Sequence, residues 1–120
     1  MKKLSFRPGQ FVFKSGEKST EIFLLVEGEV GIFLPYNETK VPDHKIGVSE
    51  IFGEMGVIEG KLRMAHARAM SDALVMAVSK TEFEAKIEAT DPFVRGLVRI
   101  LSSRIRDLQD KRNIKKNSGM

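Results

Sequence analysis

The sequence predicts a mainly β domain, a sandwich or a small barrel, followed by C-terminal helices. Short apolar or alternating runs recur through the first two thirds of the 120 residues, and turn signals separate them. A helical period replaces the alternation in the last third. The length suits one domain and is short for two.

Seven runs predict strands, and their regular spacing favours a sandwich or barrel. The turn signals between them include Pro8-Gly9, Ser15-Gly16, Glu27-Gly28-Glu29 and Pro35-Tyr36-Asn37. The predicted strands are residues 4–6, 11–13, 22–26, 30–34, 46–48, 65–69 and 74–78.

Two start signals predict helices after the strands. Ser79 and Glu82 have the spacing of a capping box, and Phe83 and Ile87 lie on one face of the helix that follows. Asp91-Pro92 places an acidic N-cap before a proline at the first helical position. We expect these helices over about 80–89 and 92–111. The domain as a whole should cover residues 1–112, with its barrel at about 4–78, and residues 113–120 should form a flexible basic tail.

The second of these helices has a heptad-like apolar seam. The spacing of the seam predicts a homodimer contact, or simply an amphipathic helix packed on its own domain. Phe93, Leu97 and Ile100 widen the apolar arc. The seam residues are Val94, Val98, Leu101, Ile105 and Leu108.

Charge and composition exclude several classes. Residues 1–60 have 7 basic and 9 acidic side chains, whereas residues 61–120 have 13 and 7. The basic C-terminal stretch suits nucleic acid or anionic lipid, or is a solvated helix face.

The chain has no cysteine, so disulfides and thiolate metal sites are excluded, and we expect a reducing, cytoplasmic location. The N-terminus lacks the apolar segment of a signal peptide, and no apolar run is long enough to span a membrane.

The segment from Phe52 to Ala67 combines residues that suit a small phosphorylated ligand. Gly53 and Gly56 allow close approach to the backbone at the start of a short helical turn. Arg63 has a planar fork of donors for phosphate oxygens, and Glu54 accepts from a sugar hydroxyl. Together they indicate a ligand with its sugar towards Glu54 and its phosphate towards Arg63. The alternative is an ion pair between Glu54 and Arg63 that only pins a loop.

The same segment resembles the phosphate-binding cassette of cyclic nucleotide-binding domains. The family pattern is roughly F-G-E-hydrophobic-small-L-I, a short loop, and P-R-x-A-T or P-R-x-A-S; the interval from Glu54 to Arg63 matches that of protein kinase A regulatory subunits. The resemblance extends to the turns at Pro8-Gly9-Gln10 and Gly16-Glu17 and to the hairpin over 22–30. It covers about residues 5–110.

The resemblance implies an eight-stranded jelly-roll β-barrel in which a C-terminal helix covers the nucleotide base. That helix often dimerises in bacterial relatives. It also implies that Glu54 binds the ribose 2′-hydroxyl and Arg63 the phosphate. The base contact is left open among Arg99, Leu101, Ser102 and Arg104. The implied ligand-binding residues are Gly53, Glu54, Met55, Gly56, Arg63, Met64 and Ala65.

Three positions depart from the family pattern. Leu62 stands where proline is usual, Met64 where alanine, serine or threonine is common, and His66 at the usual threonine or serine position. A threonine at the position of Met64 is associated with cyclic GMP, so its absence favours cyclic AMP. The departures leave two alternatives, a receptor that binds its ligand and a degenerate barrel that acts as a dimerisation or docking module.

Enzymatic function is not expected. A cupin, the strongest enzyme alternative, holds its metal with several histidines, and this chain has only His44 and His66. We therefore predict no catalytic residue, no metal and no cofactor, with cyclic AMP or cyclic GMP as ligand.

Specific DNA binding is not expected either. Catabolite activator proteins continue into a helix-turn-helix, and the C-terminal stretch leaves no room for one. The effector protein or domain is not specified by the sequence.

Overall fold

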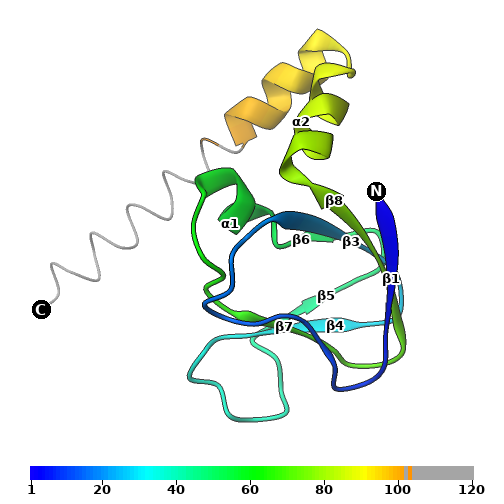
Figure 1. The fold of residues 1–120 in the computed structure, drawn as a ribbon, viewed down its shortest axis with the longest axis vertical. Coiled ribbons are helices and arrows are strands. Elements are labelled where there is room, and N and C mark those ends of the chain that lie inside the picture. Colours follow the sequence, from blue (N-terminus) through cyan, green and yellow to red (C-terminus); the bar gives the residue numbers. More distant parts are fainter. Residues whose placement is uncertain (102, 104–120) are drawn as a thin grey trace, which may run out of the picture. The chain divides into compact units, whose positions relative to one another are not determined.

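Strands of the first part of the chain form two four-stranded antiparallel sheets (Figure 1). The computed structural model describes residues 1–101 and 103. The chain divides into two units, the first over Met1–Phe83 and the second beginning at Glu84. Both sheets belong to the first unit.

The order of the strands is that of a jelly roll, as the resemblance implied. The first sheet has the order β1 (Lys2–Phe6), β8 (Ala73–Ser79), β3 (Glu21–Glu27) and β6 (Ile51–Phe52). The second has the order β2 (Phe11–Phe13), β7 (His66–Ala69), β4 (Val30–Phe33) and β5 (His44–Ile46). Neighbours in a sheet are mostly distant in sequence, so each sheet is assembled from both ends of the first unit.

The core forms from alternate residues of the strands. Along β8, Ala73, Val75 and Ala77 are buried while the residues between them are partly exposed, which is the period of a strand with one face inward. Phe23 and Leu25 do the same on β3. Strands of both sheets contribute to one buried cluster: Phe23, Leu25, Val30, Ile46, Phe52, Ala67, Ala69, Ala73, Val75 and Ala77.

Most strand ends lie within one or two residues of the prediction, and two strands differ from it more clearly. The strand expected at 46–48 is β5, and it ends at Ile46 because a turn follows, in which the Glu50 amide donates to the Gly47 carbonyl and Ser49 has a φ of 73°. Val48 lies in that turn and is exposed. The two-residue β6, which pairs with Phe23 and Leu24 of β3, was not predicted.

Three helical segments are described. The helix α1 (Glu54–Glu59) follows β6, and α2 (Lys80–Glu88) follows β8. The predicted capping box at α2 is confirmed, because the Glu82 amide donates to Ser79 Oγ and the Ser79 amide to Glu82 Oε1. Residues 92–101 are helical, and Asp91 caps them by accepting from the Phe93 amide. Ile105 and Leu108 of the predicted seam and the tail over 113–120 lie outside the described residues.

Candidate functional site

The predicted cassette, residues 52–65, connects β6 to β7 through α1. Gly53 precedes α1 with a φ of 77°, a left-handed conformation that favours glycine. Gly60 ends the helix in the same conformation. The expected short helical turn is thus present, and the chain leaves it towards Arg63.

Arg63 is buried, with 6% of its surface exposed, and it donates to two main-chain carbonyls. Nη1 lies 2.5 Å from the Gly53 oxygen, and Nη2 lies 2.6 Å from the Glu21 oxygen. One carbonyl belongs to the cassette and the other to β3. The arginine side chain therefore joins the cassette to the first sheet.

The surroundings of the Arg63 guanidinium are aromatic and acidic. Its central carbon lies 4.2 Å from the ring centroid of Phe13 and 5.5 Å from that of Phe23. Desolvation lowers the pKa of Arg63, and the negative charges of nearby glutamates, Glu54 among them, oppose that shift. An arginine stays protonated at neutral pH, so the site holds a buried positive charge, and its Nε has no hydrogen-bond partner among residues 1–101 and 103.

Glu54 and Arg63 do not form an ion pair in the part of the chain that the structure describes. The alternative in which these two side chains merely pin a loop to each other is therefore wrong, because Arg63 is held by carbonyls instead. Glu54 is partly exposed on the first turn of α1. No ion pair within the described residues involves its carboxylate, which can therefore accept from a ligand.

The two cassette glycines leave room for other side chains. A Cβ atom at Gly53 would lie 2.9 Å from Nη1 of Arg63, and one at Gly56 would lie 2.2 Å from Oγ of Ser19. Ser19 belongs to the loop over 14–20, between β2 and β3. The site prediction from the sequence missed Ser19, since a serine in a polar loop is not distinctive.

The main chain around Arg63 is held by the same loop. The Gly16 amide donates to the Arg63 carbonyl at 2.7 Å, and the Arg63 amide donates to the Glu17 carbonyl at 2.8 Å. Beside them, the Ser15 amide donates to Nδ1 of His66 at 3.0 Å. His66 is thus a partner of the loop, and its Nδ1 must be unprotonated to accept this bond.

The remaining predicted site residues lie along the same segment. Met55 and Ala65 are partly exposed, whereas Met64 has 75% of its surface exposed. Leu62, at the position where the family usually has proline, is also exposed. Leu62 and Met64 therefore present apolar surface on both sides of the buried arginine.

The second unit contains the predicted seam only in part. Val94 and Leu101 are exposed and Val98 is partly exposed on the helical residues 92–101. Arg99, a candidate base contact, pairs with Glu88 at 3.2 Å. The candidates Ser102 and Arg104 lie outside the described residues.

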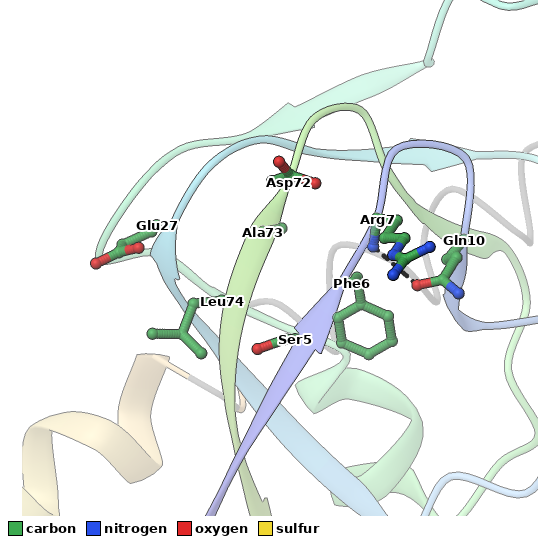
Figure 2. Close-up of a pocket in the computed structure, with 8 residues that line it drawn as sticks. All are labelled: Ser5, Phe6, Arg7, Gln10, Glu27, Asp72, Ala73 and Leu74. Carbon is green, nitrogen blue, oxygen red and sulfur yellow. Dashed lines mark hydrogen bonds between the residues drawn. The ribbon is translucent and has the colours of Figure 1, made fainter.

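A separate open groove of about 620 Å³ lies along β1 and β8 (Figure 2). Its lining includes Phe6, Leu74 and the acidic Glu27 and Asp72. The Gln10 side chain in this groove accepts from the Arg7 amide at 2.8 Å. None of the predicted cassette residues lines this groove.

Over 1–101 and 103, no helix is both long and apolar enough to cross a membrane. The same residues contain no group of three or more histidine, cysteine, aspartate or glutamate side chains placed to hold a metal ion.

The family model of the cyclic nucleotide-binding domain matches residues 3–90, which include the whole cassette and all of both sheets except Lys2. The chain belongs to this family. The cyclic nucleotide-binding domain described here thus has the jelly-roll fold and the cassette segment that its sequence resembled.

Two relatives of the domain are regulatory or channel proteins. The cAMP-dependent protein kinase regulatory subunit of Emericella nidulans is 26% identical over 92 residues, which cover 77% of this chain and 22% of that protein. A cyclic nucleotide-gated potassium channel of Rhizobium etli is 26% identical over 93 residues, which cover 76% and 24%. The chain thus spans about a quarter of the length of these relatives.

Solved structures share the fold of the domain. The half-site-occupied form of the EAL enzyme Bd1971 has a TM-score of 0.79 and 28% identity, over 90% of this chain and 97% of that chain. The catabolite activator protein of Thermus thermophilus has a TM-score of 0.74 and 22% identity, over 96% and 55%. At 22% identity, the similarity to the catabolite activator protein shows only that the two share a fold.

Proposed function

We propose that this domain is a cyclic nucleotide receptor that does no chemistry and prefers cyclic AMP to cyclic GMP. The observation that supports this most is the state of Arg63, a buried cation with an unpartnered Nε beside a glutamate that is not ion-paired to it. A cyclic nucleotide has a phosphate monoanion and a ribose hydroxyl at separate positions. Arg63 would bind the phosphate, and Glu54 would accept from the 2′-hydroxyl.

Met64 supports the preference for cyclic AMP. Its thioether has no hydrogen-bond donor, so it cannot provide the hydroxyl contact that the family associates with cyclic GMP. Relatives leave both ligands open, because Bd1971, which is 27% identical, has been solved in cAMP-bound and cGMP-bound forms. Gly53, Met55, Gly56 and Ala65 complete the proposed site.

The proposed signal is a shift of population towards a state in which the C-terminal helix covers the ligand. A ligand can shift this equilibrium only through contacts that one state has and the other lacks. Base contacts from the helical residues near Arg99 and Leu101 would provide that difference. Val94, Val98 and Leu101, with Ile105 and Leu108 beyond the described residues, are the proposed homodimer contact. A cytoplasmic location and an unidentified effector belong to this proposal.

One observation favours a second candidate, a docking module without ligand. Both terminal nitrogens of Arg63 already donate to carbonyls, so the residue has a structural role before any ligand arrives. If that were the only role of Arg63, the cassette would be a structural segment that binds no ligand. A binding experiment separates the two candidates.

The test is calorimetric titration of the 120-residue protein with cyclic AMP and cyclic GMP. Arg63→Ala should cost roughly 2–4 kcal/mol of binding free energy, about 30- to 1000-fold in affinity, because it removes charge-assisted bonds in a desolvated site. Glu54→Gln should cost less, since its amide oxygen still accepts.

The matched control is Arg7→Ala, which removes an exposed arginine outside the cassette. Thermal unfolding of each variant separates lost binding from lost fold. Binding that survives in folded Arg63→Ala would reject the cassette assignment. If the wild type binds neither nucleotide, the receptor function is rejected and the docking module becomes the better candidate.

A further inference from the structure

Two buried side-chain polar atoms have no hydrogen-bond partner in residues 1–101 and 103: Oγ of Ser19 and Nε of Arg63. Both atoms can donate a hydrogen bond, and Nε can only donate. Buried polar groups are nearly always paired, so each exception needs an explanation. Here both exceptions lie at the cassette.

Each of these two side chains lies against one cassette glycine. Arg63 occupies the space beside Gly53, and Ser19 occupies the space beside Gly56. Gly53 and Gly56 flank the first residues of α1, so the two donors lie along the beginning of the same short helix. No group among the described residues accepts a hydrogen bond from Ser19 Oγ.

We infer that Ser19 is a further ligand-contacting residue, and that its hydroxyl donates to a phosphate oxygen of the cyclic nucleotide bound by Arg63. This inference rests on the proposed function. A cyclic phosphodiester has two exocyclic oxygens that only accept, so it matches a site with two spare donors. A ribose hydroxyl matches less well, because Glu54 already offers it an acceptor.

The contact requires a local movement. Ser19 Oγ is closed to solvent and lies against Gly56 in this structure, so a ligand reaches it only when the loop over 14–20 and α1 separate at this point. The ligand then gives both donors an acceptor. Part of its binding free energy therefore comes from satisfying groups that are buried without a partner in the ligand-free domain.

Ser19→Ala tests this inference with two readouts of opposite sign. Its affinity for cyclic AMP should fall about 5- to 20-fold, since one hydrogen bond to a charged group is lost. Its melting temperature without ligand should stay level or rise, because a methyl group replaces a buried unpaired hydroxyl. The matched control is Thr20→Val, which removes the hydroxyl of the next, exposed residue and should change neither value.

A second measurement identifies the atom that is contacted. The two diastereomers of cyclic AMP phosphorothioate each replace one exocyclic oxygen by sulfur, a weaker acceptor. If Ser19 donates to one of these oxygens, the wild type should discriminate between the diastereomers and Ser19→Ala should discriminate less. In Ser19→Ala the hydroxyl donor is absent, so nothing at position 19 distinguishes sulfur from oxygen.

The outcomes separate this inference from the proposed function. Wild-type binding that is lost in Arg63→Ala but unchanged in Ser19→Ala, with the same diastereomer preference, overturns the role of Ser19 alone. Equal losses in Ser19→Ala and Thr20→Val overturn it too, because they would reflect a disturbed loop. A wild type that binds no cyclic nucleotide overturns the proposed function and this inference together.

Discussion

Arg63 lies over the ring of Phe13, with 4.2 Å between the guanidinium carbon and the ring centroid. The same side chain donates to the carbonyls of Gly53 and Glu21. Its position is therefore set by β2, β3 and the cassette together, before any ligand is bound. Changes in these supports should alter binding without touching the ligand.

Phe13→Leu should weaken cyclic AMP binding about 3- to 10-fold, because a cation–π contact of roughly 0.5–2 kcal/mol no longer holds the guanidinium in place. Calorimetry on the folded variant measures the change. Phe11→Leu is the control, since Phe11 is also on β2 but its ring lies near Lys14 and Arg68. Equal losses in both variants would argue against a role for the contact with Arg63.

Gly56→Ala should lower the free energy of unfolding by about 1–3 kcal/mol, because its Cβ would meet Ser19 Oγ at 2.2 Å. In a Ser19→Gly background the contact with Ser19 is gone and only the Lys61 carbonyl oxygen, at 3.3 Å, remains close, so with the helix propensity of alanine the same change should cost much less. Urea unfolding of the four proteins gives the coupling free energy. Additive effects would show that Gly56 is not constrained by Ser19.

His66→Leu should destabilise the domain by about 1–2 kcal/mol, because the Ser15 amide loses its acceptor in a partly buried position. His66→Asn should retain much of the stability, since an amide oxygen can take the place of Nδ1. Hydrogen exchange of the Ser15 amide measures the bond directly. Faster exchange in His66→Leu alone is the expected result, and equal protection in both variants would contradict it.

Asp43 should make the stability of the domain depend on acidic pH. The Leu34 amide, at 2.9 Å, and the Asn37 side chain, at 2.8 Å, donate to this carboxylate and lower its pKa below the ordinary 3.8. The lower folded-state pKa means that the contribution is present above about pH 3.8 and is lost as the pH falls through the folded value.

Asp43→Asn removes this titration, so its stability should fall less steeply with acid than that of the wild type. Thermal unfolding between about pH 2 and pH 6 measures the difference. Overlapping profiles for the two proteins would show that the folded-state pKa of Asp43 is not lowered.

The sequence was informative where an apolar run bounded by turn signals, or a complete motif, decides the structure. The apolar runs over 22–26 and 74–78 and the cap at Ser79 predicted elements that the structure contains. The end of β5 was not predictable in this way, because the apolar Val48 continues the pattern into a turn. β6 was missed because two residues are too few for a period.

The site shows a similar division. The sequence predicted Glu54 and Arg63 as the charged ligand-binding pair of the cassette, but left their ion pair as an alternative. The acceptors of Arg63 are main-chain carbonyls of Gly53 and Glu21, and any residue type provides a carbonyl. The position of Ser19 could not be predicted for a related reason, since only the fold brings this residue against Gly56.

The place of β8 between β1 and β3 has a consequence for synthesis of the chain. β1 leaves the ribosome before the other strands of its sheet, but its partner in that sheet is β8, which ends at Ser79. The first sheet therefore cannot assemble until almost all of the first unit has been made, and such long-range pairing is slow. During that interval the nascent chain has a complete cassette sequence but no sheet to hold Arg63. A newly made domain should become able to bind its ligand only after β8 has inserted.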